Sequence, residues 1–148
     1  SYIKEIKDIP VYFTTIRYGK PYPLFNSANT AMPQESRVLL VTGIANPQPL
    51  KAEIEERGAK VELMQYADHH NFSIADIELI AKRFHNIKAK RKIILTTEKD
   101  YVRLSSTKLR PALEGLPIYY IPIGIRFHEG NNTSFDNEIL RLLANQNL

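Results

Sequence analysis

The sequence predicts an α/β fold: a small, mostly parallel sheet of about four strands with helices on both faces, preceded by an N-terminal linker strand. One observation is a series of four short apolar runs that are continuous rather than alternating, which indicates strands buried on both faces. Another is that helical patterns separate these runs, and strand-helix alternation is typical of a parallel α/β sheet. The third is length: 148 residues, 43% of them hydrophobic, are enough for one domain with a core.

The first segment, VYFTTIRYGKPYPLF (residues 11–25), begins as an alternating β-rich run and ends among prolines. Because proline cannot donate to a ladder, we expect a strand followed by an extended linker. Residues 26–36 are small and polar without an apolar period, which is typical of a loop. The core is therefore expected to begin at Arg37.

The remaining elements follow in order. Strands are expected at VLLVT (38–42), VELMQY (61–66), KIILTT (92–97) and PIYYIP (117–122). The stretch PLKAEIEERG (49–58) has proline near its start and Gly58 past its end, as a helix requires. A second helix, 73–84, opens with Ser73 as a cap and Asp76 three residues later. A last helix at 134–144 is expected to close the layer.

Composition excludes several classes of protein. No apolar stretch approaches the roughly 20 residues of a membrane-spanning helix, and SYIKEIKDIP is too charged for a secretory signal. Zero cysteines exclude disulfides and thiolate metal sites, which fits a reducing compartment such as the cytosol. Residues 82–110 contain ten basic residues and only two acidic ones. That segment suits phosphates or an anionic bilayer, and it equally suits solvated loops and helix ends.

Three unusual loops are predicted to meet at one edge of the sheet. They are TGIANP (42–47), ADHHNFS (67–73) and TTEKDYVRL (96–104), and each follows a core strand. Ligands of open parallel sheets bind at the carboxyl ends of the strands, where loops gather and helix N-termini point. The candidate site residues on these loops are Gly43, Asn46, Asp68, His69, Thr97, Glu98, Lys99, Asp100 and Arg103.

Structural explanations stand beside these functional ones. Gly43 permits close approach of a ligand, or simply a tight turn before Asn46 and the next helix. Thr97 suits a helix cap, and Glu98 and Asp100 suit a first helical turn on dipole grounds. Lys99 opposes the dipole there, so we expect an anionic group beside it.

Asp68, His69 and His70 admit three interpretations. As a metal site they lack further ligands, and adjacent histidines do not easily grip one ion, so we expect no metal. As a proton relay, a histidine beside an acid can orient or activate another group. As structure, they form a polar turn ahead of the Ser73 cap. No Walker loop, G-x-G-x-x-G or G-x-S-x-G occurs, so the chain alone offers no nucleotide phosphate site and no serine nucleophile.

The ordered set GIANP (43–47), Asp68-His69-His70 followed by Phe72-Ser73, and TEKDYVRL (97–104) resembles the C-terminal half of the tetraacyldisaccharide 4'-kinase family, the lipid A 4'-kinases. LPIYYIPIGIRF (116–127) and the Tyr-Gly of the opening strand are similar to the same family. The resemblance extends from about Val11 to Leu143. It implies a bacterial enzyme of lipopolysaccharide synthesis that uses ATP and Mg²⁺ to phosphorylate the 4'-hydroxyl of the lipid A precursor tetraacyldisaccharide 1-phosphate.

The resemblance also implies how this chain takes part. Asp68 and His69 would be catalytic, with His69 paired to a carboxylate of an N-terminal lobe that deprotonates the acceptor hydroxyl, and His70 would be scaffold. Residues 1–36 would be a linker strand and loop that join this missing lobe, and 37–148 a C-terminal α/β domain. The start without Met suggests a piece of a longer protein. The enzyme would lie peripherally on the cytoplasmic side of the inner membrane and bind no nucleic acid. This piece alone would bind neither ATP nor Mg²⁺ and would be inactive.

Two alternatives remain open on the sequence. A DHH-type phosphoesterase also carries Asp-His-His on an α/β scaffold, but it needs acidic metal ligands upstream. The acidic residues of the segment 26–65 are Glu35, Glu53, Glu55, Glu56 and Glu62. Most of them lie away from the predicted edge of the sheet. The other alternative is a non-catalytic module whose basic segment binds anionic lipid or phosphate.

Overall fold

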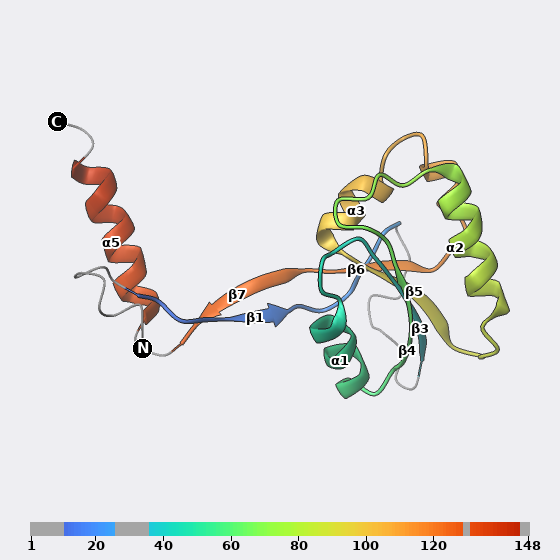
Figure 1. Cartoon of the computed structure of the whole chain (residues 1–148), viewed down its shortest axis with the longest axis horizontal. Coiled ribbons are helices and arrows are strands. Elements are labelled where there is room, and N and C mark those ends of the chain that lie inside the picture. Colours follow the sequence, from blue (N-terminus) through green and yellow to red (C-terminus); the bar gives the residue numbers. More distant parts are fainter. Residues whose placement is uncertain (1–10, 26–35, 129–130, 146–148) are drawn as a thin grey trace. The chain divides into compact units, whose positions relative to one another are not determined.

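A computed structural model describes residues 11–25, 36–128 and 131–145 (Figure 1). The chain divides into two compact units, one formed by Ser1–Arg17 with Gly124–Leu148 and the other by Tyr18–Ile123. We call them unit 1 and unit 2. The division expected at residue 36 concerns the joining of a further lobe, and it remains a prediction. Parts of residues 1–36 lie outside the described residues.

Unit 2 contains a five-stranded sheet in the order β2-β6-β5-β3-β4. The strands are β2 (Tyr22–Pro23), β3 (Arg37–Thr42), β4 (Lys60–Gln65), β5 (Lys92–Thr97) and β6 (Ile118–Ile121). β3 runs parallel to β4 and β5, and β5 runs parallel to β6, whereas β2 is antiparallel to β6. The predicted α/β class with a mostly parallel sheet is confirmed, and the four predicted core strands all occur.

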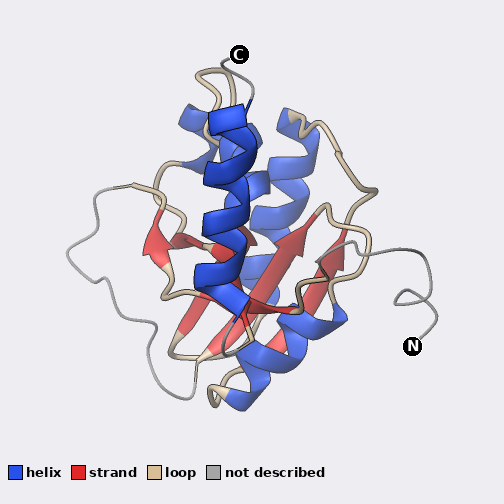
Figure 2. Ribbon diagram, turned by 90° about the vertical axis from the view of Figure 1, so that its left-hand side faces the viewer, coloured by secondary structure: helices blue, strands red, loops and turns tan. Residues whose placement is uncertain are grey.

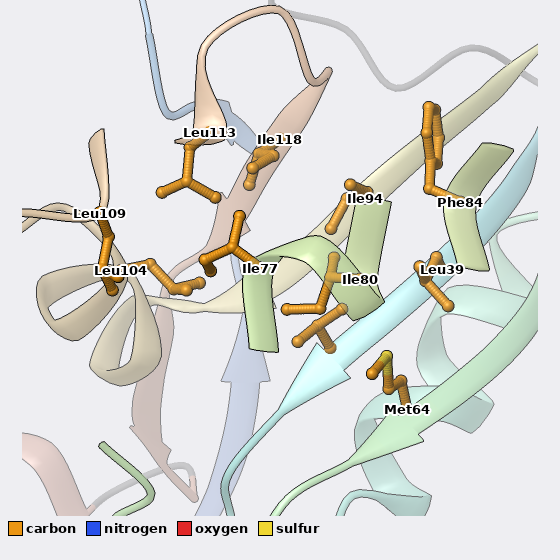
Figure 3. Close-up of a cluster of buried hydrophobic side chains, with 11 residues drawn as sticks. Leu39, Met64, Ile77, Ile80, Phe84, Ile94, Leu104, Leu109, Leu113 and Ile118 are labelled. Carbon is orange, nitrogen blue, oxygen red and sulfur yellow. The ribbon is translucent and has the colours of Figure 1, made fainter. Parts of the chain in front are cut away.

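Helices cover both faces of this sheet (Figure 2). On one face α1 (Gln48–Glu56) buries Leu50 and Ile54 against Val38, Leu40 and Leu95. On the other face lie α2 (Ile74–Asn86), α3 (Glu98–Leu104) and α4 (Arg110–Leu113). Figure 3 shows Ile77 and Ile80 of α2 directed at the strand residues Leu39 and Ile94. Alternate residues of β3 thus enter opposite cores, which explains its continuous apolar run.

One strand departs from this expectation. The sequence predicts that β4 is buried on both faces, but only Met64 is buried along it. β4 ends the strand order, so it has a neighbour on one side only. Its Val61 and Leu63 therefore reach only partial burial.

Local chemistry begins and ends α2 as predicted. The Ser73 hydroxyl accepts from the Asp76 N–H, and the Asp76 carboxylate accepts from the Ser73 N–H, which makes a full capping box. At the other end Lys92 Nζ donates to the carbonyls of Phe84 (2.9 Å), His85 (3.2 Å) and Ile87 (3.0 Å). A cation at a helix C-terminus satisfies orphan carbonyls and the dipole together.

Unit 1 contains β1 (Thr14–Tyr18), which pairs with β7 (Ile123–Phe127), and α5 (Asn131–Asn145). Pro122 separates β6 from β7, so LPIYYIPIGIRF forms two strands in two sheets. The final helix exists, and its expected closing of the sheet's layer stays a prediction. It belongs to unit 1, and its large apolar side chains are exposed: Ile139, Leu140, Leu142 and Leu143. Among the described helices, none is long and apolar enough to cross a membrane.

Candidate functional site

The predicted loops do meet at the carboxyl edge of the parallel strands. Gly43 follows β3, residues 67–73 follow β4, and Thr97 ends β5 as the N-cap of α3. Since β3, β4 and β5 are parallel neighbours, their ends share one edge of the sheet. Seven predicted residues are joined there by hydrogen bonds: Gly43, Asp68, His69, Thr97, Lys99, Asp100 and Arg103.

A buried carboxylate forms the base of the site. Asp100 is 0% exposed, and its Oδ2 accepts from the Thr42 hydroxyl (3.2 Å), the Gly43 N–H (2.9 Å) and the Thr97 hydroxyl (2.8 Å). Thr97 also caps α3 by accepting from the Asp100 N–H at 3.1 Å. We call Thr42, Gly43, Thr97 and Asp100 the floor. Because Thr97 and Asp100 are fully buried, they underlie the site and do not face solvent.

Gly43 is required by its surroundings. A Cβ at this position would lie 3.0 Å from the Ala67 carbonyl oxygen and 3.3 Å from Asp100 Oδ1. The His70 Cβ would be 3.5 Å away. The glycine therefore allows the loop after β4 to lie directly on the loop after β3, which is the close-approach role that glycine serves. This neighbour is protein backbone, so the structure supports the tight-turn explanation at Gly43.

Three exposed polar side chains stand above the floor, and we call Asp68, His69 and Lys99 the rim. Lys99 Nζ donates to Asp68 Oδ1 at 3.0 Å and lies 3.4 Å from His69 Nε2. The hydrogen bond from Lys99 lowers the pKa of Asp68, burial opposes this, and the charges of His69 and Lys99 add to the lowering. The anionic group expected beside Lys99 is therefore Asp68, within this chain.

His69 adopts a backbone conformation that is rare for a residue other than glycine. Its φ is +61°, and among the residues that the structure describes no other non-glycine has a positive φ. The conformation is held by two bonds from the His69 N–H, to the Gly43 carbonyl (3.2 Å) and to Asp68 Oδ1 (3.0 Å). Its side chain is 68% exposed. Strained backbone of this kind is often found at functional sites.

Arg103 joins the floor to the rim. Its Nη1 donates to Asp100 Oδ1 at 3.1 Å, and its Nη2 donates to His69 Nδ1 at 3.0 Å. The sequence singled out Arg103 only as part of a motif. Arg103 follows Asp100 by three residues in α3, so both side chains lie on the same face of that helix. The loop after β4, which carries His69, lies next to this face.

His70 points the other way. Its ring stacks on Tyr66 at 4.6 Å between centroids, and its Nε2 lies 3.1 Å from Asp76 Oδ2. Burial opposes ionisation of Asp76, but bonds from Ser73 and His70 outweigh it and lower the pKa of Asp76. Burial and the Asp76 charge raise the pKa of Tyr66 to about 12. These contacts fit the expectation that His70 is scaffold.

Two predicted residues do not join the network. The Asn46 Oδ1 accepts from the Gln48 N–H at 3.2 Å, which is a turn before α1. Glu98 is exposed on α3. The pKa of Tyr120 is raised mainly by burial and next by the charge of Tyr101, and the charge of Glu98 makes a further contribution.

Sequence reasoning missed Thr42 and Tyr66. Thr42 lies within a continuous apolar run, where a threonine reads as a β-branched strand residue, and its bond to Asp100 spans 58 positions. Tyr66 directly follows β4, and its hydroxyl is buried with no partner among the described residues. The only available signal was that each residue lies at or just after the C-terminal end of a strand.

The ten basic residues between Lys82 and Arg110 do not form one surface. Lys99 and Arg103 are at the carboxyl edge, whereas Lys88, Lys90 and Arg91 precede β5 at the opposite edge of the sheet. Lys92 caps α2, and Arg83 Nε donates to Glu62. Within the described part of the chain, no group of three or more histidine, aspartate or glutamate side chains is arranged to hold a metal ion.

Curated relatives of this chain are tetraacyldisaccharide 4'-kinases. The tetraacyldisaccharide 4'-kinase of Phocaeicola vulgatus is 37% identical over 133 residues, which cover 87% of this chain and 36% of that protein. The one from Bacteroides thetaiotaomicron is 34% identical over 146 residues, or 88% of this chain and 37% of that protein. The chain thus spans little more than a third of the length of these relatives.

A solved structure and a family model extend the comparison. The crystal structure of LpxK from Aquifex aeolicus in complex with ATP is similar in fold, with a TM-score of 0.53 at 15% identity over 92% of this chain and 37% of that one. The family model for tetraacyldisaccharide-1-P 4'-kinase matches residues 4–144. With nearly the whole sequence matched, this chain belongs to the tetraacyldisaccharide-1-P 4'-kinase family.

Proposed function

We propose that this chain is the C-terminal lobe of a longer ATP-dependent lipid kinase, which phosphorylates the 4'-hydroxyl of tetraacyldisaccharide 1-phosphate in lipid A biosynthesis. The reaction class, phosphoryl transfer from ATP, is supported by the family to which the chain belongs. The observation that carries the site is the presentation of His69, an exposed side chain on a strained backbone above a buried polar floor. The same membership favours a kinase over a DHH-type phosphoesterase or a purely binding module.

The proposed role of His69 follows from the chemistry of phosphoryl transfer. The 4'-hydroxyl oxygen forms a bond to the γ-phosphorus while the bond from that phosphorus to the β-γ bridging oxygen breaks, and ADP leaves. A base must take the hydroxyl proton, and we assign this role to a carboxylate from the rest of the protein. His69 would donate from Nε2 to that carboxylate and orient it. Asp68 would hold His69 and Lys99 in place.

ATP and Mg²⁺ do not fit the described residues of this chain. The two cations nearest the site are both engaged, Lys99 by Asp68 and Arg103 by Asp100 and His69. No glycine-rich phosphate loop is present in the sequence. We therefore assign the phosphates of ATP and the metal ion to the part of the longer protein that this chain lacks.

The membrane relationship is part of the proposal. A kinase with a tetraacylated acceptor must meet its substrate at a bilayer surface, which supports a peripheral place on the cytoplasmic side of the inner membrane. The exposed residues Lys88, Lys90 and Arg91 would suit anionic headgroups.

The test uses the full-length protein with ATP, Mg²⁺ and tetraacyldisaccharide 1-phosphate in mixed micelles, with the product analysed by mass spectrometry. We expect one added phosphate on the 4'-hydroxyl, and no product from the 148-residue chain alone. A full-length protein that folds and binds ATP but adds no phosphate would contradict the proposal. So would manganese-dependent phosphodiester hydrolysis by this chain.

A further inference from the structure

The contacts of Arg103 go beyond the proposed function, because they determine which atom of His69 carries a proton. We propose that Arg103 is a positioning residue, which fixes the His69 ring with its proton on Nε2 and is itself held by the buried Asp100. The role in catalysis rests on the proposed function. The placement of the proton rests on the contacts alone.

The first step is the rigidity of Asp100. Its Oδ2 accepts three hydrogen bonds from the floor, and its side chain is fully buried. Three donors on one oxygen prevent rotation of the carboxylate, so the second oxygen, Oδ1, has a fixed direction. Arg103 Nη1 is bound to that oxygen. Arg103 is therefore anchored at a point that the core of the unit defines.

The second step is the shape of the guanidinium. Its N–H groups diverge in a rigid planar fork, so fixing Nη1 on Asp100 also directs Nη2. Nη2 meets His69 Nδ1 at 3.0 Å. The Arg103 side chain is 23% exposed, less than that of the His69 it contacts. A lysine has one nitrogen at the end of a flexible stem and cannot hold both partners in this geometry.

The third step concerns the proton. Arginine only donates, so Nδ1 of His69 must be the acceptor, and the neutral ring then carries its proton on Nε2. Lys99 Nζ also only donates and lies 3.4 Å from Nε2, so it competes with Arg103 for the one acceptor nitrogen of the neutral ring. Its contact is longer than that of Arg103, and Lys99 already donates to Asp68 Oδ1 at 3.0 Å, so the Arg103 contact decides the tautomer. Asp68 Oδ2 lies 3.6 Å from Nε2, beyond hydrogen-bond distance. Within the described residues Nε2–H is thus left for a new acceptor. A carboxylate accepts from N–H, so this tautomer is the one that the proposed pairing needs.

The test removes the fork without removing its bulk. Uniformly ¹⁵N-labelled 148-residue chain would be prepared as wild type, Arg103→Met and Arg103→Lys, with Arg91→Met at the opposite edge as the matched control. Long-range ¹H–¹⁵N spectra of the imidazoles report where each ring proton lies. We expect an unprotonated, hydrogen-bonded Nδ1 for His69 in wild type and in the control. In both Arg103 variants this resonance should shift toward the average of mobile tautomers, with His70 unchanged.

Turnover of the full-length protein supplies the second readout. Arg103→Met and Arg103→Lys should lower kcat by about 10- to 100-fold with little change in KM, because a misplaced group slows the step without weakening binding. If His69 carries its proton on Nδ1 in wild type, or if the variants leave its resonances unchanged, the inference is overturned. Shifted resonances with wild-type kcat, while His69→Ala is inactive, would overturn the positioning role and leave the proposed function intact. Full activity of His69→Ala would instead refute the proposed function alone, provided the resonances still shift.

Discussion

The floor and the rim of the site lie one above the other but differ in almost every physical respect. Asp100 of the floor is 0% exposed and accepts from donors at the ends of two strands, β3 and β5. Asp68 of the rim is 42% exposed and is bonded to Lys99, which is equally exposed. A carboxylate buried with its partners is costly to disturb, whereas an exposed ion pair contributes little to stability.

This difference indicates that stability and chemistry are assigned to different residues of the site. The floor joins the ends of β3 and β5 and so sets where the rim stands. The rim can then present His69 in a strained conformation without weakening the fold, because the backbone contacts with Gly43 hold it there. Substitutions in the floor should therefore affect unfolding, and substitutions in the rim should affect function.

The largest expected effect is that of Asp100→Ala. Removing this carboxylate leaves two hydroxyls, one backbone N–H and the Arg103 guanidinium without their acceptor. We expect the free energy of unfolding to fall by about 3–5 kcal/mol in urea denaturation. Glu98→Ala, in the same helical turn but exposed, is the control and should change it by less than about 0.5 kcal/mol. Equal effects of the two substitutions would show that the floor is not the stabilising region.

Gly43→Ala should be next in size. The new Cβ would lie 3.0 Å from the Ala67 carbonyl oxygen, and a backbone atom cannot move away as a flexible side chain can. We expect a loss of about 1–3 kcal/mol, measured by thermal and urea unfolding. Gly124→Ala is the matched control, because a Cβ there meets nothing within 4 Å. An unaffected Gly43→Ala variant would mean that the two loops do not lie in this close contact.

Asp76→Asn tests a carboxylate whose bonds stabilise a helix end. The pKa of Asp76 is lowered in the folded chain, so its contribution is complete above the unfolded value of about 3.9 and disappears as pH falls through the folded value. We expect a loss of about 1 kcal/mol at pH 7 from the weakened capping box, and a smaller loss at pH 3, where protonation of Asp76 is favoured in the unfolded chain. Urea unfolding at both pH values measures it. A difference that stays constant with pH would contradict this explanation.

The smallest expected effect belongs to the rim pair. Asp68 and Lys99 are both 42% exposed, so a double-mutant cycle with Asp68→Asn and Lys99→Ala should give a coupling free energy below about 1 kcal/mol. The coupling should weaken further in high salt, because exposed charges are screened. A coupling of several kcal/mol would place the rim among the stabilising interactions and remove the distinction from the floor.

The fold could be predicted because its signals are local or periodic. The apolar run of β3 and the Ser73-Asp76 spacing depend on neighbours in sequence, and both predictions are confirmed. The edge position of β4 could not be predicted, because strand order depends on which crossover each helix makes. The unit to which α5 belongs could not be predicted either, because the apolar pattern of a helix does not say which element it packs against.

The location of the site could be predicted from the sequence, but the hydrogen bonds between its residues could not. The rule that ligands bind at the carboxyl edge brought Gly43, His69 and Lys99 together on the sequence alone. Which side chain bonds which could not be read from spacing: Asp100 meets Thr42 across 58 positions, and Arg103 meets His69 across 34. The positive φ of His69 also left no signal, because glycine or asparagine would be the usual residue there.

The most direct test of the central claim is to measure activity and stability together for His69→Ala, with His70→Ala alongside. We expect His69→Ala to lower kcat of the full-length protein by about 10²- to 10⁴-fold, while its free energy of unfolding stays within about 0.5 kcal/mol of wild type. His70→Ala should lose stability, because its ring packs on Tyr66 and bonds to Asp76, and it should keep far more of its turnover. Wild-type turnover in a folded His69→Ala protein would contradict the account.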